Sequence, residues 1–224
     1  MPGREVILAT GEFYHVFNRG VASQPIVATK RNSYHFLEQM FYYQNVKAPT
    51  KYSLFKTLDK DTQNQIWTRL GQEANFLVDL VGYCLMPNHF HLLLKQNQDN
   101  GISRYLSLLT NSYTRYFNTK TERKGVLFQG KFKAVRISSN EQLIHVNRYI
   151  HLNPYSGYVV KTLKELEQYP FSSLSEYLQP AGIKHCQSKI ILDQFKSRKS
   201  YRQFVFDQAD YQKQLEWFKH LNLE

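Results

Sequence analysis

The sequence predicts an α+β fold, in which strands form a sheet and helices cover it. Three stretches indicate this fold. An apolar run from Gly82 to Lys95 is typical of a buried strand. Apolar residues recur at helical spacing from Ser103 to Asn118, and a second helical pattern follows the capping residues 138–140. At 224 residues the chain is long enough for one main domain around a single hydrophobic core.

Charge and aromatic content favour an anionic partner such as nucleic acid. Lys and Arg number 29 against 18 Asp and Glu, which gives a formal charge of +11. Tyr and Phe number 16 and 15, and aromatic rings among basic residues suit stacking on exposed bases. The sequence begins without a signal-peptide pattern and has no run of about 18 apolar residues. We therefore expect an intracellular protein with no membrane partner.

The first part of the chain predicts a strand, a helix and then a less regular segment. Residues 13–17 are typical of a strand that closes near Gly20, a position where glycine can take a positive φ. Asn32 and Ser33 can cap the helix that follows, which carries apolar residues at helical spacing. Residues 44–75 are polar and irregular, apart from one short possible helix, so we expect an insertion.

Two histidines lie in the apolar run. Side chains alternate faces along a strand, and neighbours on one face lie roughly 6–7 Å apart, so His89 and His91 share a face while Phe90 points away. Two imidazoles at that separation can bind one metal ion. The triplet alone is equally compatible with histidines on the polar face of a sheet. Residues 76–81 form a separate strand or begin this one, and Cys84 is expected in the core.

A strongly basic stretch follows the histidines. Between residues 104 and 136 eight basic side chains accompany a single acid, Glu122, and residues 126–137 alternate as a strand or hairpin would. A solvated face is the usual explanation of a charge run, but so one-sided a stretch beside a possible metal site is well placed to hold phosphates. The candidate phosphate-binding residues are Arg104, Arg115, Arg123, Lys124, Lys131, Lys133, Arg136 and, on the next helix, Arg148.

That next helix carries a polar face. Ser139 can cap its start, and Pro154 is expected to end it. Tyr149 and Asn153 lie four residues apart, so they share one side of the helix. His151 is expected at the surface or close to the metal ligands. Taken from the helix alone, Tyr149 is equally compatible with a core tyrosine.

Together these segments resemble the REP-associated tyrosine transposases, which belong to the single-tyrosine HUH transposases, named for two histidines that flank a large hydrophobic residue. The matching segments follow the family's order across most of residues 10–177: 13–20, Met86-Pro87-Asn88-His89-Phe90-His91, 125–137, 149–154 and 169–173. Phe128 stands where the family usually has Trp, and Lys131 where Arg is common. DNA contacts there would be weaker or differently shaped, because Lys lacks the bidentate fork of Arg.

The resemblance implies a ferredoxin-like or RRM-like palm: an antiparallel sheet with helices on one face and the two histidines on a central strand. It makes His89, His91 and Asn153 ligands of Mg²⁺ or Mn²⁺, with asparagine where insertion-sequence relatives use glutamine. It makes Tyr149 the nucleophile. The basic residues named above would bind DNA.

The resemblance also bounds the domains and the partners. The transposase domain would span residues 1–178, with 44–75 as an insertion, and residues 179–224 would form a helical C-terminal extension. The partner would be single-stranded or hairpin DNA, and the protein would act as a monomer or homodimer. In a bacterial cytoplasm it would be nucleoid-associated when bound to DNA.

Tyrosine chemistry explains why such a site needs a cation. A tyrosine hydroxyl with a pKa of about 10 is only about 0.1% ionised at pH 7, a cost of roughly 4 kcal/mol. A divalent ion can stabilise the charge that develops on the scissile phosphate. Attack by Tyr149 would leave a 5′-phosphotyrosine bond and a free 3′-hydroxyl, so strand rejoining needs no nucleotide cofactor.

Two other classes of function fit parts of the sequence. A domesticated protein that keeps the palm but does not cut would only bind DNA hairpins, and the intact catalytic set argues against it. A metallohydrolase that uses the two histidines and a water lacks a nearby carboxylate at suitable spacing. Tyr113 and Tyr116 are the next candidate nucleophiles, and bases could stack on rings such as Tyr14, Phe128 or Phe132.

Overall fold

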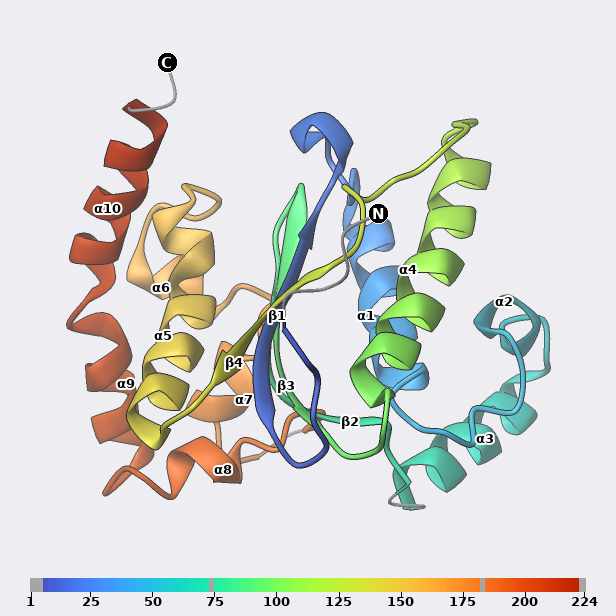
Figure 1. The fold of residues 1–224 in the computed structure, drawn as a ribbon, viewed down its shortest axis with the longest axis horizontal. Coiled ribbons are helices and arrows are strands. Elements are labelled where there is room, and N and C mark those ends of the chain that lie inside the picture. Colours follow the sequence, from blue (N-terminus) through green and yellow to red (C-terminus); the bar gives the residue numbers. More distant parts are fainter. Residues whose placement is uncertain (1–5, 73–74, 182–183, 222–224) are drawn as a thin grey trace.

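A four-stranded antiparallel sheet forms the centre of the protein, in the order β2-β3-β1-β4 (Figure 1). The computed structural model describes residues 6–72, 75–181 and 184–221. The two central strands are β3 and β1, so the histidines do lie on a central strand. The α+β prediction is confirmed. The strands are β1 (Phe13–Arg19), β2 (Val78–Leu85), β3 (His89–Gln96) and β4 (Lys133–Ile137).

Helices cover both faces of this sheet, where the sequence predicted one covered face (Figure 1). On one side lie α1 (Lys30–Tyr42) and α4 (Gly101–Lys120). On the other side lie α5 (Asn140–Ser156), α6 (Leu163–Glu167), α9 (Arg198–Phe206) and α10 (Ala209–Leu221). The reason is visible in β2, whose residues on both faces are buried. Three further short helices are η1 (Val21–Ser23), α7 (Leu174–Leu178) and α8 (Lys189–Leu192).

The apolar run that predicted one long strand is a β-hairpin. β2 ends at Leu85 and β3 begins at His89, and the backbone N–H of Met86 donates to the carbonyl of His89 at 2.9 Å. Pro87 has no N–H to give to a sheet, and its carbonyl instead accepts from the backbone of Ile26 at 2.8 Å. The continuous hydrophobicity of the run concealed this turn.

Two local expectations near the N-terminus are wrong. β1 continues to Arg19, and Gly20 has a φ of −62°, so no positive φ is needed there. A Cβ on Gly20 would overlap the carbonyl oxygen of Gln24, which is the close approach that requires glycine. α1 is capped by Thr29, whose side chain accepts from the backbone of Asn32 at 3.2 Å, one turn earlier than expected.

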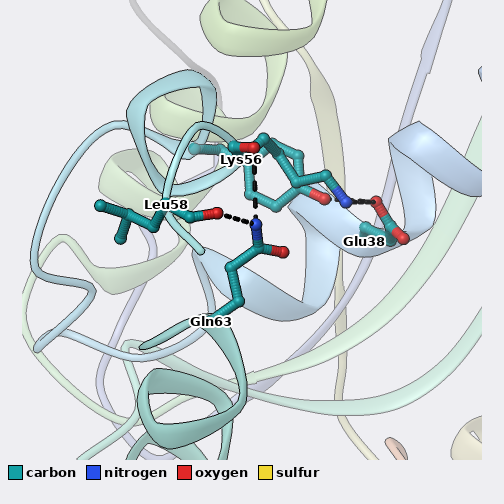
Figure 2. Close-up of polar contacts among 5 residues, drawn as sticks. Glu38, Lys56, Leu58 and Gln63 are labelled. Atoms are coloured by element: carbon teal, nitrogen blue, oxygen red, sulfur yellow. Dashed lines mark hydrogen bonds and ion pairs between the residues drawn. The ribbon is translucent and has the colours of Figure 1, made fainter. Parts of the chain in front are cut away.

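The described part of the segment 44–75, residues 44–72 and 75, packs against α1. It contains α2 (Tyr52–Phe55) and α3 (Lys60–Gln72), and the ring of Tyr42 on α1 lies 4.9 Å from that of Phe55. Figure 2 shows how polar contacts fix this segment: the side-chain amide of Gln63 donates to the carbonyls of Lys56 and Leu58. The ammonium of Lys56 lies 3.4 Å from a carboxylate oxygen of Glu38, a residue of α1.

α5 begins as predicted but runs further. Ser139 caps it by accepting from the backbone of Gln142 at 3.1 Å. Pro154 lies inside the last turn, where it removes one hydrogen bond without ending the helix. His151 is fully buried, not at the surface: its ring nitrogens lie 2.6 Å from the hydroxyl of Tyr201 on α9 and 2.8 Å from that of Ser173. These contacts join α5 to the C-terminal helices.

Candidate active site

His89 and His91 lie together on one face of β3, as the alternation predicted. Their ring centroids are 5.0 Å apart with the rings perpendicular. Phe90 points to the opposite face, where its ring lies 5.5 Å from that of Phe36 on α1. On the neighbouring strand β1, Phe17 pairs with His91. The two histidines therefore face α5, and the α1–α4 layer lies on the other side of the sheet.

Burial keeps both imidazoles neutral. It lowers the pKa of His89 to about 4, assisted by the positive charge of Arg19 and opposed by the negative charge of Glu216. It lowers the pKa of His91 well below the usual range, because the ring is almost completely buried. A neutral imidazole has a lone pair on one nitrogen, which a metal ligand requires.

Hydrogen bonds orient the two rings. Nδ1 of His89 lies 2.6 Å from Oδ1 of Asn88, whose Nδ2 donates to the carbonyl of Ser23 at 3.2 Å. An amide oxygen can only accept, so Nδ1 of His89 is the protonated nitrogen and Nε2 carries the lone pair. Nδ1 of His91 lies 2.9 Å from Nε2 of His15 on β1. Partners of this kind orient metal-binding histidines in other proteins.

α5 brings the tyrosine and the asparagine to these histidines. The ring of Tyr149 lies 5.6 Å from that of His91, at 85° to it, and 5.9 Å from that of His15. The side chain of Asn153 is buried and hydrogen-bonded to His89, and its Nδ2 donates to the carbonyl of Tyr149 at 2.8 Å. Four side chains from β3 and α5 thus meet at one place.

The two alternative tyrosines lie on the other side of the sheet. The hydroxyl of Tyr113 is buried and donates to the carbonyl of Ile26 at 2.7 Å. The ring of Tyr116 stacks on that of His35, with centroids 3.5 Å apart. Both belong to α4, so neither accompanies the histidine pair.

Comparison with known proteins assigns the family. A profile of the family described as "Transposase IS200 like" matches residues 39–153, just over half of the chain. The chain belongs to the IS200-like transposase family. A transposase cleaves DNA, and members of this family depend on a metal ion. The matched residues include β3 and most of α5, which carry the four side chains of the site.

The fold of this IS200-like transposase also matches a solved structure. That structure is described as "Structure of the REP associates tyrosine transposase bound to a REP hairpin", and the match has a TM-score of 0.50 at 13% sequence identity. It covers 84% of this chain and 98% of the other. At this identity the likeness concerns the fold. No curated protein matches the chain.

The transposase site includes residues that the sequence did not single out. His15 and Arg19 come from β1, and Arg19 pairs with His89 across the sheet. Two more come from α10: Gln212, whose side chain donates to the carbonyl of Tyr149 at 3.2 Å, and Glu216, which acts electrostatically on His89. The period-two pattern of β1 contains His15, but only the strand register shows which residue it faces.

The metal-ligand set predicted for this transposase includes the side-chain amide of Asn153. Within the described ranges, no group of three or more His, Cys, Asp or Glu side chains is placed to hold a metal ion. Two neutral imidazoles and the amide of Asn153 do fit a divalent cation that accepts nitrogen and oxygen ligands. Because Nδ2 of Asn153 donates to the carbonyl of Tyr149, its Oδ1 is the atom of this side chain that suits a cation.

The predicted DNA-binding residues are dispersed in the transposase. Lys133 pairs with Phe17 on the histidine face of the sheet, and Lys131 is exposed just before β4. Arg136 forms an exposed ion pair with Glu12 at 2.9 Å. Arg123 and Lys124 lie in the loop after α4, where Arg123 bonds to Oδ1 of Asn118 at 3.2 Å and Lys124 is exposed.

Three of these arginines do not face the histidine pair. Arg104 and Arg115 are exposed on α4, in the layer on the opposite side of the sheet. The guanidinium of Arg148 stacks on the ring of Phe204, 4.4 Å from its centroid, and bonds to His145 at 2.7 Å. Its donors are thus directed toward α9, because neighbouring residues on a helix point in different directions.

Two of the rings suggested for base stacking are core residues. Tyr14 is completely buried, and its hydroxyl accepts from the backbone of Ala9 at 2.7 Å. Phe128 is 7% exposed and lies edge-on to Phe90. Phe132 is half-buried and stays a candidate. In the part of the chain that the structure describes, no helix is long and apolar enough to cross a membrane.

Proposed function

We propose that the protein is a metal-dependent single-strand DNA endonuclease and strand transferase that cuts near hairpins, with Tyr149 as the nucleophile. One observation carries the proposal. A single turn of α5 directs Tyr149 toward His91 while it holds Asn153 against His89. Family membership makes the chain a transposase, and the arrangement of these four side chains supports their assignment to its chemistry.

His89, His91 and Asn153 would hold the divalent cation, Mg²⁺ or Mn²⁺. The cation would supply positive charge that polarises the scissile phosphate. The protein contributes orientation: Asn88 holds the ring of His89 so that its Nε2 keeps a lone pair, and His15 holds the ring of His91. Of the two ions, Mn²⁺ tolerates nitrogen ligands better.

The reaction is a transesterification in which bonds are exchanged one for one. The hydroxyl oxygen of Tyr149 attacks phosphorus and loses its proton. The bond from phosphorus to the 3′-oxygen of the upstream nucleotide breaks, and that oxygen takes up a proton. The downstream strand stays on the protein as a 5′-phosphotyrosine, and the reverse attack by a 3′-hydroxyl rejoins DNA. Arg19, exposed beside His89, is placed to bind a neighbouring phosphate.

Covalent trapping tests this proposal. We expect wild-type protein, incubated with a labelled single-stranded hairpin and Mn²⁺, to form an adduct that survives denaturation. Tyr149→Phe should abolish the adduct and leave hairpin affinity within about two-fold, because only the attacking oxygen is removed. Tyr155→Phe, which changes another tyrosine of α5, is the matched control and should form the adduct normally.

The same experiment distinguishes the alternative. A domesticated protein that only binds hairpins would show hairpin affinity but no adduct with either Mg²⁺ or Mn²⁺. That result for the wild type would contradict the proposed catalysis. An adduct of undiminished yield from Tyr149→Phe would show that another residue is the nucleophile.

A further inference from the structure

A second concave site lies on the side of the sheet away from the histidine pair. It is a cavity of about 680 Å³ between α1, α2 and α4. This volume is within the range of about 300–1,000 Å³ that small-molecule sites occupy. None of the residues of the proposed catalytic site lines it. Its walls contain cationic side chains, aromatic rings and the buried side-chain amide of Gln39.

Five cations and no acid line this cavity. Two of them are engaged: Lys56 with Glu38, and Lys120 with Oδ1 of Asn32 at 2.9 Å. The others are exposed, and within the described ranges they make no ion pair. These three are Arg31, Lys51 and Arg115. They create a positive field that an anionic group such as a phosphate would satisfy.

Flat rings form part of the wall. The ring of His35 stacks on that of Tyr116 at 3.5 Å and meets the ring of Tyr52 edge-on at 5.3 Å. Burial lowers the pKa of His35 to about 4, so this ring is neutral at pH 7 and adds no charge. Aromatic surface of this kind suits stacking with a nucleobase.

Gln39 supplies the observation that points to a ligand. Its side chain lines the cavity and is 1% exposed. Among the described residues, its Oε1 is the buried side-chain oxygen or nitrogen for which no hydrogen-bond partner is present. Buried acceptors are almost always paired, and an unpaired one is unfavourable. A ligand that donates a hydrogen bond at this place would relieve that cost.

We propose that this cavity binds a nucleotide unit. A ring N–H or amino group of the base donates to Oε1 of Gln39, and the base lies against the rings of His35 and Tyr116. The phosphate lies among the rim cations, chiefly Arg31 and Lys51. A simple anion would satisfy the cations but not the aromatic wall. The nucleotide is either free or an unpaired nucleotide of a DNA strand.

Calorimetric titration of the full chain tests this proposal. The probes are the four deoxynucleoside 5′-monophosphates and inorganic phosphate. We expect at least one mononucleotide to bind at least about ten-fold more tightly than phosphate. Gln39→Leu should weaken that binding about ten-fold, the usual effect of one lost hydrogen bond to a buried group. It should not unfold the protein, because the oxygen that it removes has no partner.

A second variant tests the same cavity without a substitution at the buried residue Gln39. Arg31→Ala combined with Lys51→Ala changes two exposed residues and should also weaken nucleotide binding about ten-fold. Lys60→Ala is the matched control, since Lys60 is exposed in the same region but does not line the cavity, and it should change affinity less than two-fold. Equal binding of nucleotide by all three variants and the wild type would overturn the proposal. Equal affinity for phosphate and nucleotide would overturn it as well.

A single-stranded tetranucleotide identifies the source of the nucleotide. If the tetranucleotide binds more tightly than any mononucleotide, and Gln39→Leu removes the difference, the site holds a DNA strand. If the mononucleotide binds as tightly, the ligand is a free nucleotide. All these readouts are binding constants, so they stand whether or not Tyr149 forms an adduct.

Discussion

The ability of the site to bind a metal ion depends on the protonation states of individual histidines. His89 and His91 are buried enough that their pKa values fall below the usual range, so they are neutral when the protein works. His15 is also buried, which lowers its pKa to about 4, and it lies 2.9 Å from Nδ1 of His91. We interpret His15 as a positioning residue, since it reaches the cation only through His91.

His15→Ala should therefore weaken the binding of the metal ion more than the binding of DNA. We expect the Mn²⁺ concentration for half-maximal adduct formation to rise about 10–100-fold, with the full yield restored at high Mn²⁺. His91→Ala should not be restored, and His145→Ala, an exposed histidine on α5, should behave as wild type. A Mn²⁺ titration of adduct yield measures all three. An unchanged half-maximal concentration in His15→Ala would refute its positioning role.

The helix α5 contacts β3 with one side and α9 with another. One side presents Tyr149 and Asn153 to β3, and another buries His151 against Tyr201 of α9. Gly82 of β2 lies close to this second side, where an added Cβ would approach the amide of Asn147 to 3.0 Å. The orientation of α5 thus depends on contacts with the sheet and with α9.

His151 makes that attachment sensitive to pH. Burial lowers its pKa to about 3, whereas the unfolded chain takes up a proton near its ordinary pKa of about 6.5. The contribution of neutral His151 to the free energy of unfolding is therefore fully present above pH 6.5 and is lost as the pH falls from there toward 3. One buried histidine of this kind lowers the free energy of unfolding by about 1 kcal/mol when the pH falls from 7.5 to 5.5.

Urea unfolding of His151→Asn at these two pH values measures this effect. The variant should be less stable than wild type at pH 7.5, because the bonds to Tyr201 and Ser173 are altered. Its loss of stability between pH 7.5 and 5.5 should be smaller than that of wild type by about 1 kcal/mol. An identical pH dependence in both proteins would mean that His151 does not stay neutral in the folded state.

Elements with strong local signals could be predicted from the sequence. The α4 periodicity, the Ser139 cap and the alternation that joins His89 with His91 are encoded in neighbouring residues, and the structure contains all three. The hairpin turn at Pro87 was not predicted, because apolar residues surround it on both sides. The roles of His15 and Gln212 depend on strand register and on packing between distant helices, which one sequence does not reveal.

At the scale of the whole molecule, the sheet separates two sets of features. The helices α5 and α10 lie on one side of the sheet, and α1 and α4 lie on the other (Figure 1). The proposed catalytic residues are on the first side, and the cavity between α1, α2 and α4 is on the second. The sequence located the first set through short motifs in the family's order. It did not locate the cavity, since that site is assembled from three segments without a shared motif. The segment predicted as an insertion supplies one of its walls through residues between 51 and 56.

The proposed reaction joins Tyr149 to the 5′-phosphate of the strand downstream of the cut, and mapping the covalent adduct shows directly whether this bond forms. A hairpin oligonucleotide labelled at its 3′ end should remain attached to the protein, whereas one labelled at its 5′ end should release its label. After nuclease digestion, peptide fragmentation should place the residual nucleotide on Tyr149. A nucleotide on Tyr113, Tyr116 or Tyr155, or retention of the 5′ label in place of the 3′ label, would rule out a 5′-phosphotyrosine bond at Tyr149.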